Sequence, residues 1–181
     1  MAQFDLTPHA GRLFHISEEP DIEIFEPRPS LSDFAAITSN VVFAISGELL
    51  HNYLLPRECP RVTYYQNPGT SAADQMEFFG SSSADFIITV PSDWYESIKT
   101  THLYCYEFAV DNFSLLDECA GYYISQQPEK PIGLRAIADA IAEILSRNAE
   151  LRFSPAILPL AAAVKKSTLG FSLIRMHNAK A

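Results

Sequence analysis

The sequence has little positive charge and no long apolar run. Its 13 Lys and Arg residues are outnumbered by 22 Asp and Glu residues, which gives a formal net charge of −9. Because such a surface repels a phosphate backbone and an anionic bilayer, we expect neither nucleic acid nor a membrane as a partner. The most apolar segment, residues 154–164, contains two prolines and is shorter than the roughly 18 residues of a membrane span. The N-terminal residues lack the apolar region of a signal peptide, so we expect a cytoplasmic protein.

Cysteines are also scarce, and several well-known motifs are missing. Cys59, Cys105 and Cys119 form no CxxC pair, which argues against a disulfide framework and a zinc site of the usual spacing. We therefore expect reduced thiols and no metal site. The chain has no GxGxxG, GxxxxGK[ST], GxSxG or HExxH motif and no acid-rich calcium loop. Nucleotide binding through those glycine loops and hydrolysis by those sites are not supported.

The residues that are present predict a folded α+β protein. The chain has 181 residues, of which 48% are hydrophobic, and this length suits one domain. We expect a flexible tail over residues 1–11 and a single globular domain over 12–181. The predicted fold is a mainly antiparallel, curved or split sheet with one long amphipathic helix and a few short helices. The long helix is expected at 132–149, where apolar residues recur every three or four positions, and strands are expected at 12–17, 40–46, 61–65, 86–91, 102–110, 120–128, 149–155 and 170–176.

His15 and Ser17 lie two positions apart on the first predicted strand, so their side chains share one face. One interpretation is structural: a half-buried histidine that bonds a backbone carbonyl. The other is functional, because a histidine can donate from one nitrogen and accept at the other while it holds a ribose or a similar polyol. The sequence leaves both interpretations open.

A second polar cluster covers residues 51–61 and contains His51, Arg57 and Arg61. Two arginines close together in a chain with few cations suggest a corner that holds an anion such as a phosphate. They also favour a lowered pKa for the thiol of Cys59 between them. The alternative is a solvated turn in which Arg57 pairs with Glu58 at little energetic gain.

A third cluster follows the strand at 120–128, where Tyr123 and Ser125 share a face. Glu129, a few residues later, is a candidate base or ribose ligand. The alternative is that it forms the exposed start of the long helix, where a negative charge suits the helix dipole. Together with Tyr123, we consider Tyr53 and Tyr64 as rings on which a ligand could stack.

Several stretches of the chain resemble a family of small bacterial and fungal proteins known as domain of unknown function 6886. The resemblance runs from about residue 13 to residue 179 and implies kinship without an activity. The stretches are "LFHISEEPDIEIFEPR", "VVFAI", "NYLLPRECPRV", "LYCYEF", "AGYYIS" and "STLGFSLIRMHNA", and "PRECPR" and "FSLIRMHNA" are the most specific.

"LFHIS" also resembles the first strand of the ADP-ribosyltransferase-like fold, whose histidine holds the nicotinamide-side ribose. In that resemblance His15 is the histidine, Tyr53 or Tyr64 the middle element, and Gln127 or Glu129 the late polar residue. It implies an ADP-ribosyltransferase-like enzyme or an NAD-type nucleotide binder, with NAD as a possible cofactor.

Two other functions remain open from the residues alone. One is a small-molecule enzyme of cyclase or isomerase type, with an apolar aromatic pocket, no nucleotide, and His15 or Glu107 as acid or base. The other is a noncatalytic interaction module.

Overall fold

The computed structural model describes Phe4, Leu6, residues 11–30 and residues 37–180. The chain divides into two compact units. The first unit comprises Met1–Leu50 and His102–Ala138, and the second comprises His51–Thr101 and Asp139–Ala181. Most of the tail predicted at residues 1–11 lies outside the described residues.

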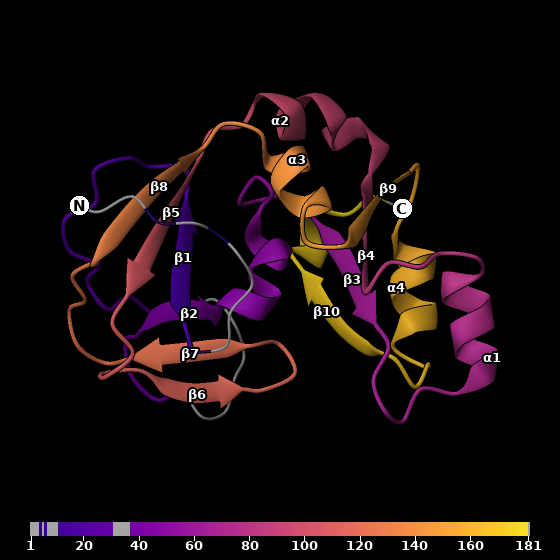
Figure 1. Cartoon of the computed structure of the whole chain (residues 1–181), viewed down its shortest axis with the longest axis horizontal. Helices are drawn as coiled ribbons and strands as arrows, with labels where there is room; N and C mark the ends of the chain where they lie inside the picture. Colours follow the sequence, from indigo (N-terminus) through magenta and orange to yellow (C-terminus); the bar gives the residue numbers. More distant parts are fainter. Residues whose placement is uncertain (1–3, 5, 7–10, 31–36, 181) are drawn as a thin grey trace. The chain divides into compact units, whose positions relative to one another are not determined.

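The first unit contains a six-stranded sheet with the order β6-β7-β2-β1-β5-β8 (Figure 1). Every neighbouring pair is antiparallel. The N-terminal strand β1 is therefore central, with β2 and then β7 on one side of it. The strands are β1 (Leu13–Ser17), β2 (Val42–Ser46), β5 (Leu103–Phe108), β6 (Ser114–Asp117), β7 (Tyr122–Ser125) and β8 (Gly133–Ile137).

One face of this sheet carries the core of the first unit. Residues that pair across β1 and β5, such as Leu13 with Phe108 and His15 with Tyr106, point to the same side. Phe25 packs on that side with edge-on ring contacts to Tyr106 and Phe108, both at 5.0 Å between centroids. The buried members of this core are Leu13, Phe25, Val42, Ala44, Tyr106 and Phe108.

A segment between β1 and β2 crosses this face and is held by backbone bonds. Two isolated bridges fix it, one between Phe25 and Glu129 and one between Arg28 and Val41. Near its start, the hydroxyl of Tyr106 donates to the carbonyl of Glu19 at 2.8 Å and accepts from the backbone N–H of Ile22 at 3.1 Å. We call residues 18–30 the covering segment.

The second unit contains a four-stranded sheet with the order β10-β3-β4-β9, in which only β4 and β9 run parallel. Its core is rich in aliphatic and aromatic side chains: Val62, Tyr64, Phe78, Phe79, Ile87, Ile157, Ala161, Val164 and Leu169. The strands are β3 (Arg61–Tyr65), β4 (Phe86–Pro91), β9 (Ala149–Ser154) and β10 (Gly170–Ile174).

The helices are short, and most of them belong to the second unit. The 3-10 helix η1 carries the chain from the first unit into the second. No helix in the described part of the chain is long and apolar enough to cross a bilayer. The elements are η1 (Gly47–Tyr53), α1 (Ala72–Asp74), the π-helical turn η2 (Gln75–Phe79), η3 (Ser92–Trp94), α2 (Tyr95–Thr100), α3 (Ala140–Leu145), α4 (Leu158–Val164) and η4 (Met176–Asn178).

The α+β class with a mainly antiparallel, split sheet is confirmed, but the long helix at 132–149 is wrong. Residues 133–137 form β8, which pairs with β5, and the helix α3 covers only six residues. Ile132 and Leu145, which supported the helical spacing, are 55% and 54% exposed. Pairing with the edge of β5 satisfies the backbone of β8, so tertiary contact overrides the local helical pattern.

Candidate functional site

His15 lies in the middle of the first-unit sheet and is half-buried. Its Nδ1 is 2.9 Å from the carbonyl oxygen of Phe43, and its ring centroid is 4.9 Å from that of Phe25. Because a carbonyl oxygen can only accept, Nδ1 carries the proton, and Nε2 is the acceptor nitrogen whenever the ring is neutral. The carbonyl contact is the one that the structural interpretation of His15 expects, and it also fixes the tautomer that a ligand would meet.

Glu129 follows β7 and is only 6% exposed, so it is not the exposed start of a long helix. The hydroxyl of Ser125, also buried, donates to Glu129 Oε1 at 2.5 Å. A buried carboxylate is costly unless it is hydrogen-bonded, and Ser125 supplies one such bond. Ser125 Oγ in turn accepts from the backbone N–H of Gln127 at 3.1 Å, which orients the hydroxyl.

Phe25 joins His15 and Glu129. Its backbone N–H donates to the carbonyl of Glu129 at 2.8 Å, and the N–H of Glu129 donates back to the carbonyl of Phe25 at 3.0 Å. Its ring contacts the imidazole of His15. Through Phe25, the covering segment therefore contacts both Glu129, four residues after the end of β7, and His15 of β1.

Tyr123 belongs to the same sheet face. It pairs with Ala44 of β2, a buried member of the first-unit core. Tyr123 also packs against that core, which includes Phe25. We call His15, Phe25, Tyr123, Ser125 and Glu129 the His15 cluster.

Ser17 lies on β1 at the edge of this cluster, two positions after His15. It pairs with Tyr104 in the register that places His15 opposite Tyr106. Its hydroxyl accepts from the backbone N–H of Glu19 at 3.0 Å. Ser17 therefore stabilises the turn with which the covering segment begins.

The remaining predicted site residues lie in the second unit, and Arg61 is buried there. Its guanidinium donates to the carbonyls of Asn52 at 2.9 Å, Pro56 at 3.3 Å and Cys59 at 2.8 Å. It also lies 5.4 Å from the ring centroid of Tyr53. These contacts stabilise the conformation of the loop after η1. The guanidinium of Arg61 is therefore buried and not accessible to the phosphate that the sequence predicted it would bind.

Arg57 and Cys59 occupy the same loop in opposite environments. Arg57 is exposed and lies 4.0 Å from a carboxylate oxygen of Glu58, which Arg175 also approaches at 3.3 Å. Cys59 is fully buried. Burial raises the pKa of its thiol to about 12 and outweighs the opposite effect of Arg61. The lowered pKa expected from the sequence is wrong, because desolvation exceeds the arginine's attraction.

Tyr64 and His51 are also buried in the second unit. The Tyr64 hydroxyl donates to the carbonyl of Phe78 at 3.2 Å and accepts from Arg152 at 3.0 Å, and burial raises its pKa. The His51 ring packs on Phe86 at 4.1 Å between centroids. The stacking role predicted for Tyr64 therefore lacks an exposed ring, and His51, predicted as a ligand residue of the polar cluster 51–61, is enclosed by protein.

Sequence reasoning missed Phe25 and the carbonyl of Phe43. Phe25 is an isolated aromatic residue within an acidic, proline-rich stretch, and that contrast is a signal for an anchored loop. The contact with Phe43 had no such signal, since every residue offers the same carbonyl. Among the residues that the structure describes, no group of three or more His, Cys, Asp and Glu could hold a metal ion.

Comparison with known proteins gives a family and nothing more specific. No curated protein and no solved structure matches the chain. The "Family of unknown function (DUF6886)" matches residues 14–179, a range that includes every residue of the His15 cluster. The chain therefore belongs to the DUF6886 family.

Proposed function

We propose that the first unit binds a ribose-bearing nucleotide of the NAD type at the His15 cluster and acts as an ADP-ribosyltransferase-like enzyme. The observation that carries the proposal is that Phe25 contacts both residues, His15 through its ring and buried Glu129 through its backbone. Strands β1, β2 and β7 are consecutive in the sheet. This order supports the resemblance to proteins that combine a histidine on the first strand with a polar residue on a late strand.

The polar groups of the cluster complement a ribose. Nε2 of His15 is an acceptor for one ribose hydroxyl, because Nδ1 carries the proton. The Glu129 carboxylate, oriented by Ser125, accepts from a second hydroxyl or from an incoming nucleophile. Tyr123, which packs against the core that contains Phe25, offers a ring for stacking. Ser17, two positions after His15 on β1, is a further polar side chain for the ligand. The proposal uses none of the second-unit residues.

Transfer of the ADP-ribosyl group would break one bond at ribose C1′ and form another. The glycosidic bond between ribose C1′ and the nicotinamide nitrogen breaks, and neutral nicotinamide leaves with the bonding electron pair. C1′ then forms a bond to the acceptor's oxygen or nitrogen, whose proton passes to Glu129. With water as acceptor the products are ADP-ribose, nicotinamide and a proton.

Calorimetric titration with NAD tests binding. Wild type is expected to bind NAD at millimolar concentration or tighter. His15→Ala should weaken the affinity at least about tenfold, which corresponds to about 1.4 kcal/mol. The control is His102→Ala, because His102 is an exposed histidine of the same unit, and it should bind like wild type. Absence of heat from wild type at millimolar NAD would remove the nucleotide proposal and leave the non-nucleotide enzyme or interaction module.

Nicotinamide release tests the transfer step separately. Glu129→Gln keeps the shape of the side chain and an oxygen that accepts from Ser125. We expect this variant to bind NAD like wild type and to release nicotinamide at least about 100-fold more slowly, the size typical of a lost acid or base. Release at the wild-type rate would show that Glu129 is not the base.

A further inference from the structure

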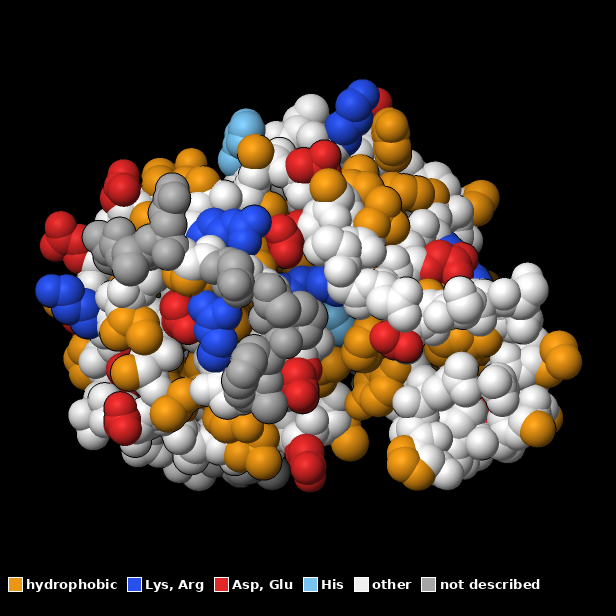
Figure 2. Space-filling view, viewed as in Figure 1, with side chains coloured by type: hydrophobic (Ala, Val, Ile, Leu, Met, Phe, Trp, Pro, Cys, Tyr) orange, Lys and Arg blue, Asp and Glu red, His pale blue; other side chains and the backbone are white. Residues whose placement is uncertain are grey.

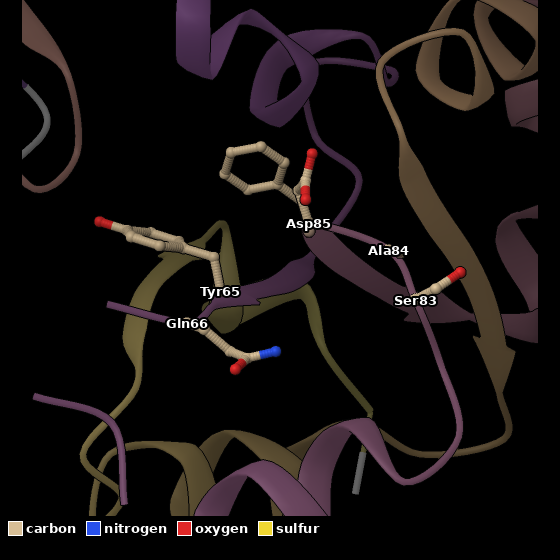
Figure 3. Close-up of a pocket in the computed structure, with 6 residues that line it drawn as sticks. Tyr65, Gln66, Ser83, Ala84 and Asp85 are labelled. Carbon is tan, nitrogen blue, oxygen red and sulfur yellow. The ribbon is translucent and has the colours of Figure 1, made fainter. Parts of the chain in front are cut away.

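A hollow of about 410 Å³ lies in the second unit, between the end of β3 and the segment that leads into β4. Figure 3 shows Tyr65 and Gln66 on one side and Ser83, Ala84 and Asp85 on the other. Phe86 completes the lining. The hollow shares no residue with the His15 cluster.

Two rings of the hollow are held in place by packing. Tyr65 and Phe86 pair across β3 and β4, with centroids 5.6 Å apart and planes inclined at 56°. Phe86 also packs on the buried ring of His51 at 4.1 Å. Both rings are half-buried, so each presents part of its surface. The predicted ligand residue His51 supports this wall from behind.

Gly170 of β10 leaves room for the Tyr65 ring. It pairs directly with Tyr65, and a Cβ at position 170 would lie 2.4 Å from two carbons of that ring. Only a glycine leaves the ring its observed place without a shift of the neighbours. The aromatic wall is therefore organised before a ligand arrives, which lowers the entropic cost of binding.

The charge of the residues that line the hollow favours a cationic ligand over an anionic one. Among the described residues that line it, only Asp85 carries a formal charge. The backbone N–H of Asp85 donates to the carbonyl of Asn148 at 2.9 Å, which fixes the start of β4. Aromatic faces attract cations through their quadrupole, and a carboxylate beside them adds Coulomb attraction. An anion finds no counter-charge there, and the net charge of −9 opposes it.

We propose that this hollow binds a small organic ammonium ion. The alkyl groups of the ion pack on Tyr65 and Phe86, and its charge lies near the Asp85 carboxylate. The side-chain oxygen of Gln66 accepts an N–H bond where the ammonium carries hydrogens. This site goes beyond the proposed nucleotide function and depends on none of its residues.

Two probes of nearly equal shape test the proposal: tert-butylammonium chloride and neutral tert-butanol. Each is titrated into the full chain at constant ionic strength while the backbone amide signals are followed by NMR. We expect saturable shifts at residues 65–66 and 83–86 with the ammonium, and at least about tenfold weaker binding of the alcohol. Equal affinity for the two probes, or shifts spread over both units, would overturn the proposal.

Matched variants test whether the Asp85 carboxylate and the Tyr65 ring contribute to ammonium binding. Asp85→Asn should weaken ammonium binding at least about fivefold, whereas Asp111→Asn should bind like wild type, because Asp111 is an exposed carboxylate of the first unit. Tyr65→Leu should weaken binding by a similar factor, and its amide spectrum reports whether the second unit remains folded. Unchanged affinity in Asp85→Asn would overturn the proposal, whatever the result with NAD.

Discussion

The thiol of Cys59 illustrates how burial decides the chemistry of a single residue. Two arginines flank Cys59 in the sequence, but Arg57 is exposed and directed to Glu58, and Arg61 donates to three carbonyls. The sulfur itself lies near the carbonyl of Pro60 at 3.6 Å. The folded protein therefore keeps this thiol protonated and poorly nucleophilic.

The raised pKa of Cys59 predicts a loss of stability at alkaline pH. The folded thiol has a pKa of about 12 against an ordinary value of 9.0, so only the unfolded chain loses this proton between those limits. The free energy of unfolding should fall by about 1.4 kcal/mol per pH unit above pH 9 from this group, and should not change below pH 9.

Urea unfolding of wild type and Cys59→Ala at pH 8 and pH 10.5 measures this effect. Cys59→Ala is expected to be less stable at pH 8, because it leaves a cavity, but to lose about 2 kcal/mol less than wild type between the two pH values. Tyr64 and Tyr106, whose pKa values are also raised by burial, contribute equally to both proteins. Identical pH dependence in the two proteins would contradict the assignment.

At the scale of elements, α3 begins where a side chain caps it. Asp139 adopts an extended backbone conformation, and its Oδ1 accepts from the N–H of Ala142 at 2.8 Å. The cap explains why the helix starts at Ala140, after β8 has ended at Ile137. An aspartate before an apolar run is a typical sign of a helix start. This sign was missed because the apolar periodicity begins earlier, at residue 132.

Loss of this cap should destabilise α3 measurably. Asp139→Ala is expected to lower the free energy of unfolding by about 1 kcal/mol, since the first turn loses a hydrogen-bond acceptor. Asp139→Asn retains an acceptor and should stay within a few tenths of a kcal/mol of wild type. Urea titration of the three proteins measures the difference. An equal loss in both variants would show that the negative charge, and not the cap, stabilises the helix.

Strands were easier to predict than helices for a physical reason. Segments such as "RVTYY" and "FIITVP" combine β-branched and aromatic residues over a strand's length, and β3 and β4 form there. By contrast, β6 was not expected, because its sequence lacks a clear alternation of apolar and polar residues. The turn that follows β6 brings it alongside β7, with which it pairs. Short helices leave too few residues for a periodic signal.

At the scale of the whole molecule, charge is the property that the sequence predicts most directly. Figure 2 shows acidic side chains at many separate places on the visible face. Some cations are engaged with acids, as in the 2.7 Å contact between Arg12 and Glu107. The negative excess should therefore govern encounters with other polyanions.

The protein should not bind DNA. We expect no shift of a 30-base-pair duplex at 50 mM salt and protein concentrations up to about 10 μM, since nonspecific binding needs phosphate neutralisation by Lys and Arg. An electrophoretic mobility assay with a basic DNA-binding protein as positive control measures this. A salt-sensitive shift would show that a local basic surface outweighs the net charge.

The sequence by itself determined the α+β class, most strand positions, the family and the sign of the surface charge. These properties depend on composition and on neighbours a few positions apart. Tertiary structure decided the contacts of the predicted residues: Glu129 is buried and bonded to Phe25, whose ring contacts His15, whereas Arg61 is bonded to carbonyls of its own loop. Such contacts depend on strand order and burial. Because desolvation and hydrogen bonding act only once the chain is folded, no local pattern could assign them.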